Sequence, residues 1–232
     1  ARINANNFAL FDVDRIEVLR GPQGTLFGRN TTQGAINIVL KKPAPEFGAS
    51  VELSAGNYNH WQVRGSLDLP VSDKIRTRFA AYKMDEDGWV DNITTGGTNN
   101  AHTGWGARAA LAADLTDSIT WDLSADYIQD ENPFIPQSYL NGNRVSRSGL
   151  QPLGALLPGR KGEIPGNSLE NKTFGFSSNL KFGTAIGDVE VISGYRDLTA
   201  QYSLDYFDNP AAIGGFDSVE YSTHTQFTQE VK

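Results

Sequence analysis

The sequence predicts an all-β protein whose antiparallel strands form part of a transmembrane β-barrel. Apolar and polar residues alternate with a period of two over most of the chain, which is typical of strands with one apolar and one polar face. The connections between these runs are alternately short and long, as in outer-membrane barrels with turns on one side and loops on the other. Aromatic residues lie near the ends of the apolar faces, where such barrels carry interfacial girdles: Tyr58, Trp61, Trp105, Trp121 and Tyr127.

Composition excludes several classes of protein. The 232-residue chain has a net charge of −7 and no basic stripe, so no nucleic-acid partner is expected. It has no cysteine, which excludes disulfides and thiolate zinc sites, and its histidines lack metal-ligand spacing, so we expect neither a metal nor a cofactor. No apolar run approaches the roughly 20 residues of a membrane helix. The chain starts at Ala1 without a signal peptide, and we expect it to begin inside a longer polypeptide.

The N-terminal part contains two apolar, β-branched runs, Arg15–Arg20 and Ala35–Leu40, which are predicted strands. Glycine recurs between them, together with a proline that cannot donate to a strand ladder. The segment GTLFGRN lacks the Gly-Lys-Ser/Thr of a phosphate loop. We therefore interpret the glycines as backbone requirements of a compact turn region, not as ligand-binding residues: Gly21, Gly24, Gly28 and Gly34.

Two prolines in Pro43–Phe47 indicate an extended linker, and regular alternation begins at Gly48. The next runs are joined by short turns or by the long loops Asp87–Ala101, Glu131–Glu170 and Gln201–Tyr221. Eight barrel strands are predicted, and the last is incomplete: 48–55, 61–69, 75–86, 105–113, 119–127, 173–182, 189–199 and 222–232.

The segment 11–43, FDVDRIEVLRGPQGTLFGRNTTQGAINIVLKKP, resembles the end of the plug domain of TonB-dependent outer-membrane receptors. In that family an RIEVLRGP strand, a GTLFGR turn and a GAINIV strand follow one another just before the barrel. The resemblance implies a barrel of about 22 strands plugged from within, of which this chain would hold about a third. It implies that residues 1–43 are the C-terminal part of the plug, 44–47 the linker and 48–232 the N-terminal part of the barrel.

The function implied by the resemblance is active uptake of a scarce nutrient, most commonly a ferric siderophore, across the bacterial outer membrane. The implied partners are the ligand, outer-membrane lipid and the TonB-ExbB-ExbD complex, whose contact segment in the family precedes this chain. No catalytic chemistry is implied. Vitamin B12, haem and plant-derived or carbohydrate ligands remain open as cargo.

The resemblance also implies site residues. Plug arginines of the RIEVLRGP strand pair with barrel carboxylates in the family, and Arg15 and Arg20 match those positions. They are predicted to form a plug–barrel latch, with partners expected beyond Lys232. Ligand contacts are expected in the long loops, since loops on a rigid scaffold carry specificity. Aromatic and cationic residues in the longest loop suit an anionic chelate: Phe134, Tyr139, Arg144, Arg147, Arg160 and Lys161.

Two alternatives remain open on the sequence. One is an outer-membrane channel for passive diffusion, against which the plug motif argues. The other is a soluble secreted β-protein, such as a carbohydrate-active enzyme, in which Asp122 and Asp126 could serve as paired acids. These two residues lie in a series of alternating polar positions, which is more typical of a wet barrel wall.

Overall fold

The computed structural model of the chain describes residues 10–22, 24, 34–88, 90–91, 98–99, 101–133, 168–184, 187–205 and 217–232. Within these ranges, no helix has the length and apolarity needed to cross a bilayer.

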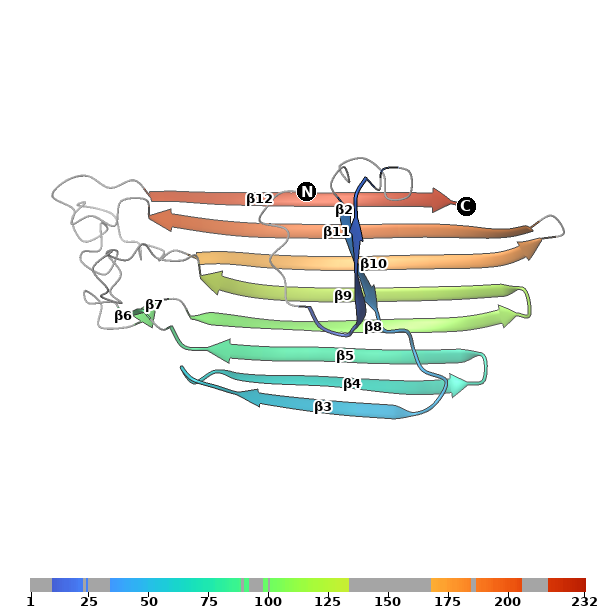
Figure 1. The fold of residues 1–232 in the computed structure, drawn as a ribbon, viewed down its shortest axis with the longest axis horizontal. Coiled ribbons are helices and arrows are strands. Elements are labelled where there is room, and N and C mark those ends of the chain that lie inside the picture. Colours follow the sequence, from blue (N-terminus) through green and yellow to red (C-terminus); the bar gives the residue numbers. More distant parts are fainter. Residues whose placement is uncertain are drawn as a thin grey trace.

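Eight long strands form one antiparallel sheet in the order β12-β11-β10-β9-β8-β5-β4-β3 (Figure 1). Their bounds are β3 (Gly48–Ala55), β4 (Trp61–Ser72), β5 (Ile75–Glu86), β8 (His102–Thr116), β9 (Ile119–Pro133), β10 (Ser168–Thr184), β11 (Gly187–Asp205) and β12 (Asp217–Val231). Each strand of the sheet therefore pairs with the one that precedes or follows it along the sheet-forming part of the chain. This up-and-down arrangement confirms the predicted fold class.

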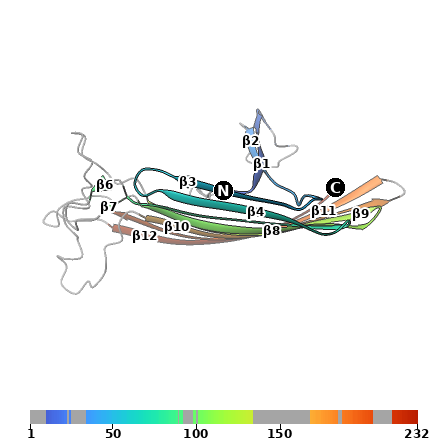
Figure 2. The same cartoon turned by 90° about the horizontal axis from the view of Figure 1, so that it is seen from below.

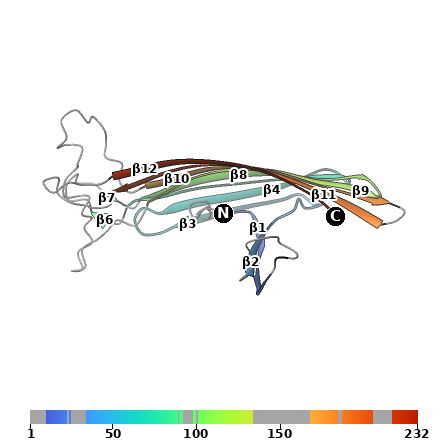
Figure 3. The same cartoon turned by 90° about the horizontal axis from the view of Figure 1, so that it is seen from above.

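A separate hairpin precedes the sheet. Its strands β1 (Val13–Arg20) and β2 (Gly34–Leu40) pair antiparallel, with Val18 opposite Ile36 and Arg20 opposite Gly34. Figures 2 and 3 show that this hairpin stands on the concave side of the curved sheet. The two runs predicted from the sequence are thus paired with each other and lie apart from the large sheet.

The sheet has a polar face toward the hairpin and an apolar face away from it. Arg78 on β5 and Arg108 on β8 reach Asp12 beside the hairpin, so their side chains lie on the concave face. Successive strand residues point to opposite faces, which places Phe79 and Ala109 on the other side. The polar lumen wall and apolar outer wall of a barrel are therefore both present.

The apolar face is bounded by tryptophans at two levels. Trp105 lies opposite Lys83, and Trp121 lies opposite Ala113. Because positions 105 and 113 share β8, the two levels are about 26 Å apart at ~3.3 Å per residue. With the strand tilt of about 40° in outer-membrane barrels, this separation corresponds to ~20 Å of height, somewhat less than the apolar band of roughly 25 Å that such barrels present to lipid.

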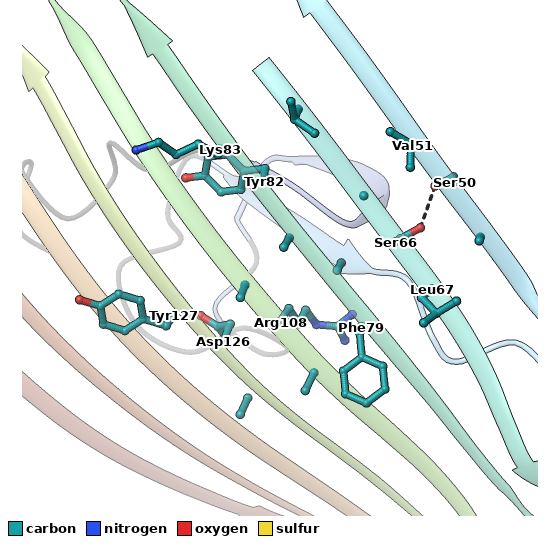
Figure 4. A pocket seen from close by; sticks show the side chains of 18 of the residues that line it. Ser50, Val51, Ser66, Leu67, Phe79, Tyr82, Lys83, Arg108, Asp126 and Tyr127 are labelled. Atoms are coloured by element: carbon teal, nitrogen blue, oxygen red, sulfur yellow. Dashed lines mark hydrogen bonds between the residues drawn. The ribbon is translucent and has the colours of Figure 1, made fainter. Parts of the chain in front are cut away.

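Between these two levels, small side chains leave an open apolar groove of about 840 Å³ (Figure 4). Phe79 and Tyr127 stand beside it. The small residues that line it include Gly65, Ala81, Ala107, Ala109 and Ala125. The groove lies on the face that a barrel turns toward acyl chains, away from the hairpin.

Several strands are longer than the alternation predicts. β10 begins at Ser168 and β11 ends at Asp205, beyond the predicted ranges 173–182 and 189–199. β12 likewise covers Asp217–Val231, and β6 (Val90–Asp91) pairs with β7 (Thr98–Asn99) inside a segment predicted as loop. The physical reason is that the ladder uses backbone groups, so a strand continues where both faces are polar and apolar periodicity is lost.

Gly34 combines two requirements that Gly24 lacks. Its φ is +147°, and a Cβ added there would overlap the carbonyl oxygen of Leu19. Gly21 shares a left-handed φ, at +83°, but an added Cβ there would meet nothing within 4 Å. Gly24 has no left-handed φ, and an added Cβ would meet nothing within 4 Å. Gly28 lies outside the described residues.

We expect Gly34→Ala to destabilise the β1–β2 hairpin by about 1–3 kcal/mol, because alanine tolerates neither the backbone conformation nor the overlap. Gly24→Ala is the matched control and should have little effect. Amide hydrogen exchange of β1 and β2 measures both variants. Equal protection in the two variants would contradict the assignment.

Candidate functional site

A buried cluster of opposite charges joins the hairpin to the sheet. Asp12, which precedes β1, has a side chain only 1% exposed. Its Oδ1 accepts hydrogen bonds from Arg78 Nε at 2.8 Å and Nη2 at 2.7 Å. Its Oδ2 accepts from Arg108 Nη1. One carboxylate of the hairpin segment therefore contacts two strands of the sheet, β5 and β8.

Asp68 on β4 completes the cluster. Its Oδ2 accepts a hydrogen bond from Arg78 Nη1, and its Oδ1 accepts from the backbone nitrogen of Ala44 at 3.0 Å. The cluster thus also fixes the segment between β2 and β3. Two aspartates face two arginines, so the cluster is neutral as a whole, which buried charges require.

The base of the hairpin is closed at the same place. The Lys41 backbone nitrogen donates to the carbonyl oxygen of Asp12 at 2.9 Å. Arg108 Nη1 donates to the carbonyl oxygen of Lys41, also at 2.9 Å. The residue before β1 and the residue after β2 are therefore held together and against the wall.

Small neighbours make room for the guanidinium groups. Arg78 lies opposite Ala110 on the adjacent strand, and Arg108 lies opposite Ala80. The arginine side chains are 7% and 8% exposed. Because each arginine faces an alanine across the β5–β8 pair, both arginine side chains have room to turn toward Asp12.

An apolar contact flanks the ions. Phe11 packs on Tyr82, with ring centroids 4.9 Å apart and an interplanar angle of 51°. The buried cluster around them contains Phe11, Ala80, Tyr82, Met84 and Ile128. Phe11 and Asp12 therefore place an aromatic ring and a carboxylate side by side against the inner face of the sheet. Among the described residues, the Tyr82 hydroxyl and Arg108 Nε are buried without a hydrogen-bond partner.

The predicted latch arginines lie elsewhere. Arg15 is exposed and pairs within its own strand, with Asp14 at 2.9 Å and Glu17 at 2.7 Å. Arg20 ends β1 opposite Gly34. The predicted partners of Arg15 and Arg20 were expected outside this chain, so their latch role stays a prediction.

The predicted ligand-binding residues lie outside the described part of the chain: Phe134, Tyr139, Arg144, Arg147, Arg160 and Lys161. The two acids weighed for an enzyme are each paired with a cation, Asp122 with Lys42 at 2.8 Å and Asp126 with Arg196 at 2.6 Å.

Among the described residues no group of three or more metal-ligating side chains gathers. His60 and His102 instead contact the carboxylates of Glu86 and Asp130.

Sequence reasoning missed the Asp12 cluster. It assigned the polar face of the strands correctly but gave no role to Asp12, Asp68, Arg78 or Arg108. A usable signal was present, because long cations and aspartates occur at polar-face positions of neighbouring strands beside alanines. What the sequence could not supply is the docking of Asp12, which is 66 residues from Arg78 and 96 from Arg108.

These features define a class of protein: a barrel wall of long antiparallel strands, apolar outside and polar inside, with a hairpin held on the inner face by buried ions. This is the architecture of a plugged outer-membrane receptor.

Comparison with known proteins supports this class. The ferripyoverdine receptor of Pseudomonas aeruginosa is 33% identical over 124 residues, which are 52% of this chain and 14% of that protein. The ferric-pyoverdine 358 receptor of Pseudomonas putida is 27% identical over 140 residues, 58% of this chain and 16% of that protein. The chain thus spans about a sixth of these relatives or less. No protein-family model matches it.

Solved structures agree on the fold. The ferric yersiniabactin uptake receptor FyuA of Yersinia pestis matches 96% of this chain and 33% of its own, with a TM-score of 0.73 at 20% identity. The siderophore receptor PiuA of Acinetobacter baumannii matches 95% of this chain and 32% of its own, with a TM-score of 0.71 at 14% identity.

The resemblance to TonB-dependent outer-membrane receptors is confirmed, as is the outer-membrane location. The named relatives are receptors rather than enzymes, as expected.

We expect Asp12→Asn to destabilise the docked hairpin by about 3–5 kcal/mol, because it leaves two buried arginines with one aspartate. Asp14→Asn, two residues along and 49% exposed, is the matched control and should change little. Hydrogen exchange of β1 and β2, measured in the intact receptor, compares the two. Similar exchange in both would show that the Asp12 pair does not hold the hairpin.

A second prediction concerns pH. Hydrogen bonds from the Asn37 amide at 2.9 Å and the Arg15 guanidinium at 2.7 Å lower the pKa of Glu17. Since this pKa is lower in the folded state, the stabilisation is complete above the ordinary carboxyl pKa and is lost as pH falls through the lowered value. Protection factors of β1 and β2 should therefore fall over this acidic range. Glu17→Gln should remove that part of the pH dependence, and an unchanged profile in the variant would refute the linkage.

Proposed function

We propose that the chain is the junction of plug and barrel in a receptor that takes up a ferric siderophore across the outer membrane, driven by TonB-ExbB-ExbD. The observation that carries the proposal is the buried Asp12 cluster. It holds a hairpin against the polar wall through ions and hydrogen bonds, which can be broken and remade without covalent change.

The cluster also favours a gated receptor over a passive channel. A hairpin fixed on the inner wall obstructs a lumen, and opening a path then requires work against buried ion pairs. Coupling to an energised inner-membrane complex would supply that work. A passive channel would have no need for so well buried an attachment.

An uncovered apolar face on the hairpin fits a larger plug. Ile16, Val18 and Ile36 are 50%, 66% and 70% exposed. Exposed apolar side chains gathered on one face indicate a missing packing partner. In the proposed receptor, the rest of the plug covers this face.

The proposed domain assignment is 1–43 for the plug, 44–47 for the linker and 48–232 for the barrel. It is supported by the end of β2 at Leu40 and the start of β3 at Gly48. Arg15 and Arg20 are proposed as a further latch toward strands outside this chain. The proposed ligand contacts are Phe134, Tyr139, Arg144, Arg147, Arg160 and Lys161. Siderophore is preferred as cargo because the relatives named above are receptors for ferric pyoverdines.

The test is uptake of radioiron by cells that express the full-length receptor. Siderophores loaded with radioiron are supplied, beginning with ferripyoverdine, to cells with and without TonB. We expect surface binding in both strains but accumulation only when TonB is present, and a protonophore should abolish it. Equal accumulation without TonB would favour the passive channel. TonB-dependent uptake of haem or vitamin B12, with no uptake of any siderophore, would show that the cargo is wrong but that active uptake is right.

A further inference from the structure

We propose that Arg78 and Arg108 form a carboxylate-binding site on the inner barrel wall, which Asp12 fills at rest and an anionic group of the cargo fills after Asp12 moves away. The proposal rests on the proposed function, since it requires a plug that shifts and a cargo that passes. The ligand class is a carboxylate or a similar small oxyanion.

The first step is that Asp12 is bound as a ligand would be. Its carboxylate comes from a different element than the arginines, and it receives hydrogen bonds on both oxygens from Arg78 and Arg108. Both arginine side chains are more than nine-tenths buried. Arginine forks that grip a carboxylate from two sides are a general device for recognising this group.

The second step is the charge left when Asp12 departs. The cluster then contains two arginines, Arg78 and Arg108, and one aspartate, Asp68, so its net charge is +1. Arg78 retains its bond to Asp68. Arg108 keeps at most a neutral acceptor, the Lys41 carbonyl at the base of the hairpin, and its Nε has no partner among the described residues even at rest. Arg108 is therefore the buried cation of this cluster that then lacks an ion-pair partner and would bind a replacement anion.

The third step is the space beside the cluster. A polar cavity of about 270 Å³ lies between the hairpin segment and the sheet, lined among others by Asp12, Glu52, Arg64 and Arg78. A third arginine is thus at hand: Arg64 lies 4.0 Å from Glu52, and its Nε is buried without a partner in the described structure.

The three arginines are arranged as successive levels. Arg108 lies opposite Ala80, and Arg64 lies opposite Tyr82, while Arg78 is on β5 itself. The arginines thus stand level with positions 78, 80 and 82 of β5, and successive positions on one face of a strand are ~7 Å apart along the strand. The arginines lie on three neighbouring strands, β4, β5 and β8, so an anionic group passes from one to the next by moving both along and across the strands.

Asp126 is the internal competitor, because it lies opposite Arg108 on β9. It is held elsewhere by Arg196, which crosses Gly175 to reach it. A side chain at Gly175 would collide with both Arg196 and Asp126, so the glycine keeps that pair together. Arg108 thus has no spare carboxylate within the described wall.

The test is chemical rescue of Asp12→Ala in the full-length receptor. Thermal unfolding is measured in sodium formate and in sodium chloride of equal ionic strength. We expect formate to raise the unfolding midpoint of Asp12→Ala by several degrees more than chloride, and to leave the native protein unchanged. The gain should vanish in Asp12→Ala combined with Arg108→Gln. Asp12→Ser serves in the same assay if Asp12→Ala does not fold.

The matched control is Asp126→Ala, whose partner Arg196 is 51% exposed and is solvated by water when the carboxylate is lost. Formate should not stabilise this variant more than chloride does. Equal formate effects on Asp12→Ala and Asp126→Ala, or no formate-specific effect on Asp12→Ala and Asp12→Ser, would overturn the proposed site. This assay needs no transport, so its failure is distinct from a failure of TonB-dependent uptake.

A transport measurement then asks whether the site is used. Initial uptake of a carboxylate-bearing ferric chelate is compared between Arg108→Lys and Arg108→Gln, with surface binding measured on unenergised cells. We expect equal surface binding, and uptake at least severalfold faster in Arg108→Lys because it keeps the positive charge. Equal uptake rates in the two variants would show that cargo does not use Arg108.

Discussion

The structure depends on one carboxylate that is removed from water and shared between two strands. Asp12 is 1% exposed and faces Arg78 and Arg108, which are themselves buried. Removing three such ionised groups from water is costly unless each is paired, so the wall and the hairpin segment must come together in one geometry. This requirement fixes the position of the hairpin more tightly than the solvent-exposed contact of Lys42 with Asp122 could.

The two faces of each strand lie in different environments, lipid outside and water or protein inside, and this explains their composition. The outer positions between Trp105 and Trp121 are mostly alanine, leucine and aromatic residues, as a band facing acyl chains requires. The inner positions carry charges because the lumen is wet or filled by protein. The hydrogen bonds between strands are made by backbone groups, which do not depend on what the side chains face. The strands can therefore continue beyond the apolar band, as β11 does to Asp205.

The sequence predicts the sheet well because period-two alternation encodes burial on each face directly. The residues that face the hairpin on β5 and β8 are therefore assigned correctly, and strand ends are wrong only where alternation stops. The cluster around Asp12 was not predicted, because it depends on long-range docking that leaves no local period. For Arg15 the structure adds local contacts with Asp14 and Glu17, and its predicted latch partner beyond Lys232 stays a prediction.

The sequential strand order bears on how such a wall is made. Each strand of the large sheet pairs with its neighbour along the chain, and among the described residues further strands, β6 and β7, occur only in the β5–β8 connection. Closing a hairpin costs far less chain entropy than bringing distant segments together. The sheet can therefore grow by one hairpin at a time, with each new strand templated by the last. The Asp12 cluster needs β4, β5 and β8 together, so the hairpin can dock only after this part of the wall exists.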